Sequence, residues 1–208
     1  MSQFFQIHPD NPQKRLIKQA AEIIKSGGLA IIPTDCAYAL ACQLEDKKAL
    51  ERVKQIRQLN DKHNFTLMCG DLAEISTYAK VDNTAYRLLK NHTPGAFTFI
   101  LDGTREVPRR LMHPKRRQIG IRIPDNNIIR DLIDELGEPI MTTSLIMPGD
   151  DMPLSDPYDI RQMLEHAVDL VIDGGYCGIE ATTVVDMTGD DYKITRQGLG
   201  QMAELDHS

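Results

Sequence analysis

Short apolar runs alternate along this chain with amphipathic segments of helical length. The run Leu29 to Ile32 is typical of a buried strand, and the segment Pro12 to Ser26 before it has its apolar residues on one helical face. Gly27 and Gly28 follow that segment and predict the end of the helix. Strands mixed with helices of this length indicate an α/β fold.

The same periodicities continue along the chain. Helices are predicted over residues 46–59, 82–90, 126–136 and 156–166. Strands are predicted over residues 65–69, 97–101, 119–123, 139–143, 168–172, 183–187 and 192–195. Several neighbouring strands have no helix between them, so we expect a mixed sheet rather than a purely parallel one. The 208 residues suit one large domain or two small ones, and they suffice to bury a core without disulfides or metals.

The cysteines and the N-terminal residues indicate in which cellular compartment the protein is expected. Cys36, Cys42, Cys69 and Cys177 form no C-x-x-C pair, and no histidine pair has the spacing of a zinc site. The start MSQFFQIHPD lacks a basic segment and an apolar run, and no stretch of the chain has the length and apolarity of a membrane span. We therefore expect a cytoplasmic protein with reduced thiols, no membrane partner and no metal site of its own.

Charge is distributed unevenly along the chain. The net charge is -6, which argues against a general nucleic-acid binder. The segment Arg105 to Arg117, REVPRRLMHPKRR, nevertheless carries +5. Such a segment can attract a phosphate or a polyanion, or it can be a solvated loop paired with nearby acids. The candidate residues for RNA or phosphate binding are Arg109, Arg110, Lys115, Arg116 and Arg117.

Small polar residues follow the first predicted strand, in the stretch AIIPTDCAYALACQLED. A proline and three small polar residues at the end of a core strand indicate that the backbone turns there. In open α/β sheets, ligands bind at that edge. We therefore expect Pro33 to Leu40 to form one wall of a small-molecule pocket.

Hydroxyl side chains and arginines recur at the ends of other predicted strands. No P-loop, dinucleotide fingerprint or nucleophile elbow is present. A single threonine in a strand usually reflects β-propensity, so only the joint pattern is informative. Arginines and hydroxyls that converge on one sheet edge suit an anionic ligand. The set comprises Thr34, Thr98, Arg122, Thr142, Thr143, Ser144, Thr182, Thr183 and Arg196.

Five stretches that contain these residues resemble, in order, the signatures of the YrdC/YciO family. IIPTDCAYAL is similar to P-T-[DE]-T-x-Y-G-L, HTPGAFTFIL to P-G-P-x-T-x-I-L, and IGIRIPD to V-x-V-R-x-P. PIMTTSLIMPG is similar to P-[IL]-x-x-[ST]-S-A-N-x-S-G, and EATTVVDMTGDDYKITRQG to S-T-[IV]-V-D followed by R-x-G. The motifs cover about residues 13–200, and the departures described below resemble the YciO branch.

The resemblance implies a fold and an activity. The fold is a single YrdC/RibB-like α/β domain over residues 1–208, with a twisted, mostly mixed or antiparallel sheet and a concave basic face. The activity is that of threonylcarbamoyl-AMP synthases, in which bicarbonate and L-threonine form a carbamate that attacks the α-phosphate of ATP. Mg²⁺ assists, pyrophosphate leaves, and the product serves a modification of tRNA. The chemistry requires cations and hydroxyls around the phosphate but no covalent enzyme intermediate.

The resemblance also implies roles for individual residues. Those implied for a small amino acid or carbamate are Thr34, Cys36, Arg122, Thr142 and Thr182. Those implied for ATP or another nucleotide are Arg57, His63, Gln118, Ser144 and Arg196.

Several polar positions of the family are altered here, which affects the expected activity. Cys36 stands for a threonine, Leu59 for an arginine, Met68 for a histidine and Ile146 for an asparagine. We therefore expect a weak or altered synthase. The alternative is a protein that binds tRNA or double-stranded RNA through phosphates and has no catalysis or a different one.

Overall fold

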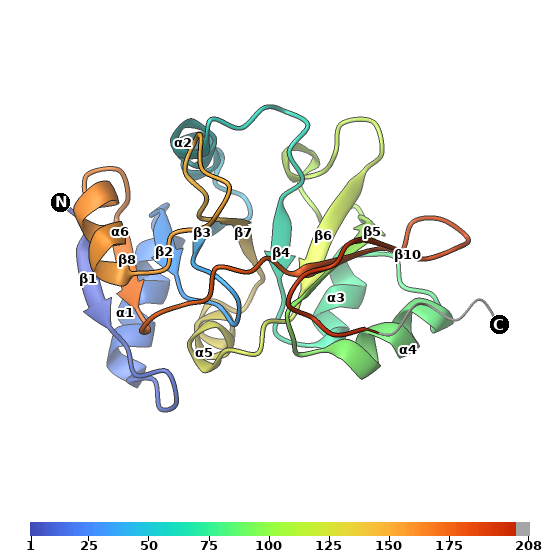
Figure 1. The fold of residues 1–208 in the computed structure, drawn as a ribbon, viewed down its shortest axis with the longest axis horizontal. Coiled ribbons are helices and arrows are strands. Elements are labelled where there is room, and N and C mark those ends of the chain that lie inside the picture. Colours follow the sequence, from blue (N-terminus) through green and yellow to red (C-terminus); the bar gives the residue numbers. More distant parts are fainter. Residues whose placement is uncertain (203–208) are drawn as a thin grey trace.

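A ten-stranded mixed sheet organises residues 1–202, the part of the chain that the computed structural model describes (Figure 1). The strands are β1 (Gln3–Gln6), β2 (Ala30–Ile32), β3 (Ala39–Gln43), β4 (Thr66–Met68), β5 (Phe97–Asp102), β6 (Gln118–Arg122), β7 (Ile140–Ser144), β8 (Leu170–Asp173), β9 (Thr183–Asp186) and β10 (Lys193–Arg196). The helices are α1 (Lys14–Lys25), α2 (Lys47–Arg57), α3 (Leu72–Tyr78), α4 (Asn83–His92), α5 (Asn127–Leu136), α6 (Pro157–Leu164) and the 3-10 helix η1 (Arg109–Leu111).

The order of strands across the sheet is β1-β8-β2-β3-β7-β4-β6-β5-β9-β10. The pairs β1–β8, β8–β2, β4–β6 and β5–β9 are parallel, and the remaining neighbours are antiparallel. The mixed α/β sheet expected from the sequence is thus confirmed. Strands from the two halves of the chain alternate in its centre, which brings β3, β7, β4 and β6 side by side.

Helices cover both faces of the sheet. One core contains residues of α1 and α5 together with Ala30 and Ile32 of β2, and the other contains residues of α2, α3, α4 and α6 together with Leu29 and Ile31. Successive residues of this short stretch therefore enter different cores, because side chains alternate across a strand. That is why the run is continuously apolar.

Capping residues fix where most helices begin. The side chains of Asp46, Asp71, Asp82, Asn126 and Asp156 accept a backbone N–H in the first turn of α2, α3, α4, α5 and α6. The helix starts predicted at Asp82 and Asp156 agree with these caps, and the helix end predicted at Leu136 agrees with the end of α5. Gly137 ends α5 with a φ of 72°, a conformation that glycine adopts without strain.

Three elements are not anticipated by the sequence pattern. Strand β3 lies in the middle of the sheet, so Ala39 to Cys42 are buried on both faces and show no alternation. Strand β1 is a four-residue edge strand, and α3 has only seven residues. Segments this short hold too few periods to be recognised.

No helix in residues 1–202 combines the length and the apolar character that a membrane span requires.

The N-cap of α2 leads to a prediction about stability. This helix also positions Arg57, which is its last residue. Asp46 accepts the N–H of Ala49 at 2.8 Å, so Asp46→Ala should lower the free energy of unfolding by about 1 kcal/mol. Urea denaturation measures this, with the exposed Lys48→Ala on the same helical turn as the matched control. Equal midpoints for the two variants would contradict the capping role.

Candidate functional site

A small cavity of about 40 Å³ opens where strands β3, β4, β6 and β7 meet the turn after β2. Its lining is dominated by hydroxyl side chains around one guanidinium. The residues are Thr34, Cys36, Ala37, Ala39, Thr66, Met68, Thr98, Arg122, Thr142, Thr143, Ser144 and Thr182. The structure therefore brings together all five residues that the sequence assigns to a small substrate, and Pro33 to Leu40 supplies one wall as expected.

The hydroxyl of Thr34 holds the turn after β2 in shape. Its Oγ1 accepts the backbone N–H groups of Cys36 and Ala37, each at 3.1 Å, and donates to the carbonyl of Ala37 at 2.5 Å. Its only proton is thus committed to Ala37. This leaves the thiol of Cys36 as the donor in the 3.4 Å contact between Cys36 Sγ and Thr34 Oγ1.

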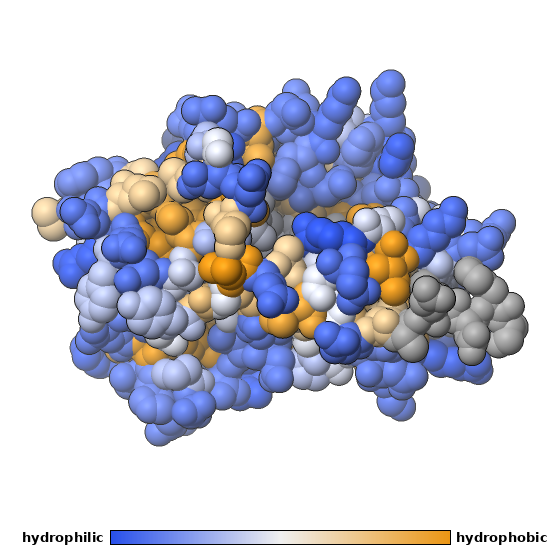
Figure 2. Space-filling view, viewed as in Figure 1, coloured by the Kyte–Doolittle hydropathy of each residue, from blue (hydrophilic) through white to orange (hydrophobic). Residues whose placement is uncertain are grey.

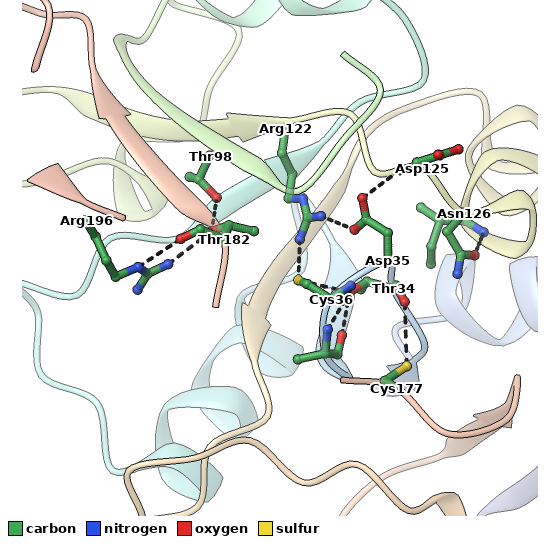
Figure 3. Close-up of polar contacts among 12 residues, drawn as sticks. Thr34, Asp35, Cys36, Thr98, Arg122, Asp125, Asn126, Cys177, Thr182 and Arg196 are labelled. Carbon is green, nitrogen blue, oxygen red and sulfur yellow. Dashed lines mark hydrogen bonds and ion pairs between the residues drawn. The ribbon is translucent and has the colours of Figure 1, made fainter. Parts of the chain in front are cut away.

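Arg122 lies at the end of β6 and is buried, with only 5% of its side chain exposed. One terminal nitrogen forms an ion pair with Asp35, and the other donates to Cys36 Sγ at 3.3 Å (Figure 3). Asp35 in turn accepts the backbone N–H of Asp125 at 2.9 Å. The Nε of Arg122 is buried and has no partner within residues 1–202. A buried donor without an acceptor is costly, so this group favours a ligand that accepts from it.

Arg196 of β10 contacts Thr182, a residue of the cavity lining. Its Nε donates to the carbonyl of Thr182, and a terminal nitrogen donates to Thr182 Oγ1, both at 3.0 Å. Thr182 Oγ1 lies 2.8 Å from Thr98 Oγ1 (Figure 3). These contacts align a guanidinium and two hydroxyls along one side of the cavity.

Arg57 and His63 approach from the α2 side of the sheet. Arg57 donates to Thr143 Oγ1 at 3.0 Å and to the carbonyl of Ser144, while His63 Nε2 lies 2.9 Å from Thr143 Oγ1. Burial, together with the Arg57 charge, lowers the pKa of His63 from its ordinary value of 6.5 to about 4. His63 is therefore neutral at pH 7, and Thr143 anchors both groups beside Ser144.

A second cavity of about 270 Å³ lies between α2 and η1. Lys54, Arg109 and Arg110 contribute cations to its lining, and Phe65 and Met112 contribute apolar surface. The ring of His63 meets Phe65 edge-on at 5.1 Å, which places this cavity next to the Arg57 cluster.

Two of the candidate residues from the sequence have positions or partners that the sequence does not reveal. Gln118 lies at the opposite end of β6 from Arg122, and its carbonyl accepts the N–H of His113 beside the second cavity. Arg110 is partly committed within the chain, because it donates to Glu45 at 3.2 Å and to the carbonyl of Leu44 at 3.3 Å. The rest of the basic set, Arg109, Lys115, Arg116 and Arg117, is exposed on the connection between β5 and β6.

The sequence assigned no role to Asp35 or Thr66. Asp35 stands inside the motif that contains Thr34, and its carboxylate is the only acidic group in that turn, which is the signal that could have found it. Thr66 is opposite Thr142 in the register of β4 and β7, and Thr142 Oγ1 donates to the carbonyl of Thr66 at 3.2 Å. That register depends on strand pairing, which a single sequence does not reveal.

Within residues 1–202, no three side chains of His, Cys, Asp or Glu gather closely enough to hold a metal ion.

Comparisons with known proteins identify the family to which the chain belongs. The family model Sua5_yciO_yrdC, described as telomere recombination, matches residues 22–198. The chain is 57% identical over 202 residues to YciO of Escherichia coli K12, covering 97% of this chain and 98% of that one. The crystal structure of E. coli YciO superposes with a TM-score of 0.94 over the same shares.

The names of more distant relatives state an activity or a ligand. The threonylcarbamoyl-AMP synthase of Mus musculus is 28% identical over 179 residues, which are 83% of this chain and 62% of that protein. The crystal structure of P. abyssi Sua5 complexed with L-threonine has a TM-score of 0.87 at 22% identity, covering 95% of this chain and 58% of that one. At that identity the Sua5 likeness supports the fold.

The buried pair between Asp35 and Arg122 generates a stability prediction. Asp35→Ala leaves a buried guanidinium without its counter-ion, so the free energy of unfolding should fall by about 3 kcal/mol. The matched control is Asp131→Ala, which breaks the more exposed pair with Arg130 and should change stability by less than about 0.5 kcal/mol. If denaturation shows the same loss of unfolding free energy in both variants, Asp35 does not act as the counter-ion of a buried guanidinium.

The depressed pKa of His63 generates a pH prediction. In the unfolded chain His63 takes up a proton near pH 6.5, but in the folded protein it does so only near pH 4. Its contribution to stability is therefore complete above pH 6.5 and is lost as the pH falls toward 4. NMR titration of the imidazole should give a midpoint near 4 that rises in Arg57→Ala. A midpoint near 6.5 in both proteins would refute the buried, Arg57-facing placement.

Proposed function

The chain belongs to the Sua5/YciO/YrdC family, and we propose that it is an ATP-dependent synthase of the threonylcarbamoyl-AMP type with weak or altered activity. In the proposed reaction, the amine of a small amino acid bonds to the carbon of bicarbonate, a C–O bond of the bicarbonate breaks, and water leaves, which gives a carbamate. A carbamate oxygen then bonds to the α-phosphorus of ATP, and the bond from that phosphorus to the pyrophosphate leaving group breaks. The observation that carries the proposal is the hydroxyl-lined cavity around the buried Arg122, whose Nε has no hydrogen-bond partner within residues 1–202.

The amino acid is proposed to occupy the 40 Å³ cavity and the space above it. Its carboxylate would accept from the Nε of Arg122, whose terminal nitrogen pairs with Asp35. Thr142 and Thr182 would supply hydroxyl contacts to the rest of the molecule. Cys36 and Met68 give the pocket a softer, less polar lining, which favours a substrate whose side chain need not be that of threonine. The L-threonine bound to P. abyssi Sua5 supports an amino acid as the ligand class.

ATP is proposed to lie across Ser144, between Arg57 and Arg196, with its nucleoside toward the cavity that contains Phe65 and Met112. Cations at the phosphates stabilise the charge that develops when pyrophosphate leaves. Mg²⁺ enters this proposal with ATP, as part of the substrate complex. Leu59 packs against the apolar core and supplies no charge, so the missing cation would slow the reaction by about 100-fold or more.

The synthase proposal is tested by direct detection of the product. The purified protein is incubated with ATP, Mg²⁺, bicarbonate and L-threonine, and then with other small amino acids in place of threonine. Mass spectrometry should detect an aminoacyl-carbamoyl adenylate, and a coupled assay should detect equimolar pyrophosphate.

Two site variants and one control decide the outcome. Ser144→Ala and Arg196→Ala should each lower the rate by about tenfold or more, whereas Lys14→Ala, on the exposed surface of α1, should leave it unchanged. Absence of an adenylate with every amino acid, or an undiminished rate in both site variants, would overturn the proposal.

We propose as the second candidate function that the basic segment binds double-stranded RNA or tRNA. Arg105, Arg109, Lys115, Arg116 and Arg117 are exposed, and none has an ion-pair partner among the described residues. The surface over this connection is hydrophilic (Figure 2). Unpaired, clustered cations of this kind bind phosphates without reading bases.

The RNA proposal is tested by the salt dependence of binding. Affinity for a duplex RNA should fall steeply between 50 and 200 mM salt, by about tenfold or more, if several phosphates are contacted. The double variant Arg116→Glu with Arg117→Glu should flatten that dependence, and the control Lys14→Glu with Arg15→Glu on α1 should retain it. A flat dependence in the unmodified protein would refute the proposal.

A further inference from the structure

Exposed apolar side chains are concentrated on one part of the surface, around α6. The described residues include eight large hydrophobic side chains that are exposed, and six of them lie on α6 or on segments next to it. They are Met1, Met152, Tyr158, Met163, Tyr176 and Ile179. Figure 2 shows apolar side chains gathered on this side of the molecule, whereas the surface over the β5–β6 connection is hydrophilic. Such a gathering marks an interaction surface.

Contacts between three segments make this surface continuous. Tyr158 packs against Phe4 of β1 with ring centroids 5.8 Å apart and the rings tilted by 37°, and its hydroxyl accepts from Gln6 at 3.0 Å. Tyr176 donates its hydroxyl to Asp156, the N-cap of α6, at 3.1 Å. We call residues 146–166 and 173–180 together the α6 surface.

The α6 surface is also acidic. Its two segments contain seven carboxylates and a single arginine. That arginine, Arg161, lies with its guanidinium carbon 4.5 Å from the centre of the Phe4 ring and pairs with Glu165. Asp150, Asp151 and Glu180 are exposed, and none forms a salt bridge within residues 1–202.

Carboxylates next to exposed tyrosine and methionine side chains favour a partner that is rich in arginine. Arginine stacks on aromatic faces and pairs with carboxylates at the same time, so an arginine-rich segment satisfies both features. Arg161 on Phe4 is an example of that contact within this surface. A nucleic acid is disfavoured because the carboxylates repel its phosphates.

The chain itself contains such a segment, residues 105–117, with six basic residues and one acid. Five of those cations are exposed and unpaired among the described residues, so both surfaces lack counter-charges within one molecule. In Figure 1, α6 lies at the upper left of the molecule and the connection between β5 and β6 at the upper right. A twofold arrangement of two copies can therefore pair each basic segment with the α6 surface of the other and close at a dimer.

We propose that the α6 surface docks residues 105–117 of a second copy of this chain. The inference does not rest on the synthase proposal, although Met112 of residues 105–117 lines the cavity proposed there for the nucleoside. Because the attraction is between exposed charges, it weakens as salt screens them. The α6 surface also borders the candidate site, because Cys177 donates to the carbonyl of Thr34 at 3.6 Å.

Sedimentation of the full chain at several salt concentrations tests the proposal. In 50 mM salt the protein should form a dimer whose dissociation constant rises about tenfold or more by 500 mM salt. Two variants should each weaken the dimer by about tenfold or more: Arg116→Glu with Arg117→Glu, and Asp150→Arg with Asp151→Arg. The control, Lys14→Glu with Arg15→Glu, should dimerise normally. All these positions are exposed, and circular dichroism confirms that each variant is folded.

Combining the charge reversals of the two surfaces distinguishes a direct contact between them from a non-specific effect of the altered net charge. The protein that carries all four reversals should regain the dimer, and so should an equal mixture of the two doubly reversed variants, because opposite charges then face each other again. A monomer at every salt concentration, a dimer unaffected by the reversals, or failure of both rescues would overturn the proposal. Adenylate formation measured on the same variants tells a failed dimer proposal apart from a failed synthase proposal.

Discussion

The buried ion pair between Arg122 and Asp35 is the interaction on which the candidate site depends. Arg122 ends β6, and Asp35 lies in the turn between β2 and β3, so the pair joins strands from separate parts of the sheet. Asp35 also accepts the N–H of Asp125, which ties the turn to the start of α5. A guanidinium this deeply buried requires a counter-charge, and Asp35 supplies it while leaving Nε free. The pair therefore shapes the cavity and leaves it one unmet donor.

The rest of the site is arranged around that donor by strand ends. The central strands β3, β7, β4 and β6 place hydroxyls at the rim, and the last strand of the sheet contributes Arg196. Helix α2 brings Arg57 to Ser144, where Thr143 and the neutral His63 hold it. Positive charge thus stands at both sides of a polar cavity, which is the arrangement that phosphoryl chemistry requires. The altered positions are apolar, which explains why the proposal is for a weak or altered synthase.

Features of the fold and of the site could be predicted from the sequence where neighbouring residues determine them, and not where they depend on contacts between distant residues. Caps such as Asp82 and Gly137 act within one turn, and they marked helix ends correctly. Strand β3 has no alternation because it is buried on both faces, so its periodicity carried no signal. The turn at Thr34 was anticipated as a pocket wall, but the partner of Arg122 was not, because Asp35 and Arg122 are 87 residues apart. For the same reason, the pairing of Arg110 with Glu45 and the distance of Gln118 from Arg122 required the three-dimensional structure.

We propose that the Nε of Arg122 holds the substrate of this protein. The ¹⁵N resonance of that Nε, assigned by its loss in Arg122→Lys, is recorded before and after addition of MgATP, bicarbonate and a small amino acid. The resonance should shift, and its proton should become protected from exchange, only when the amino acid or its carbamate is present. An Nε resonance that stays unchanged while an adenylate accumulates would refute this role of Arg122, because the substrate would then be bound elsewhere.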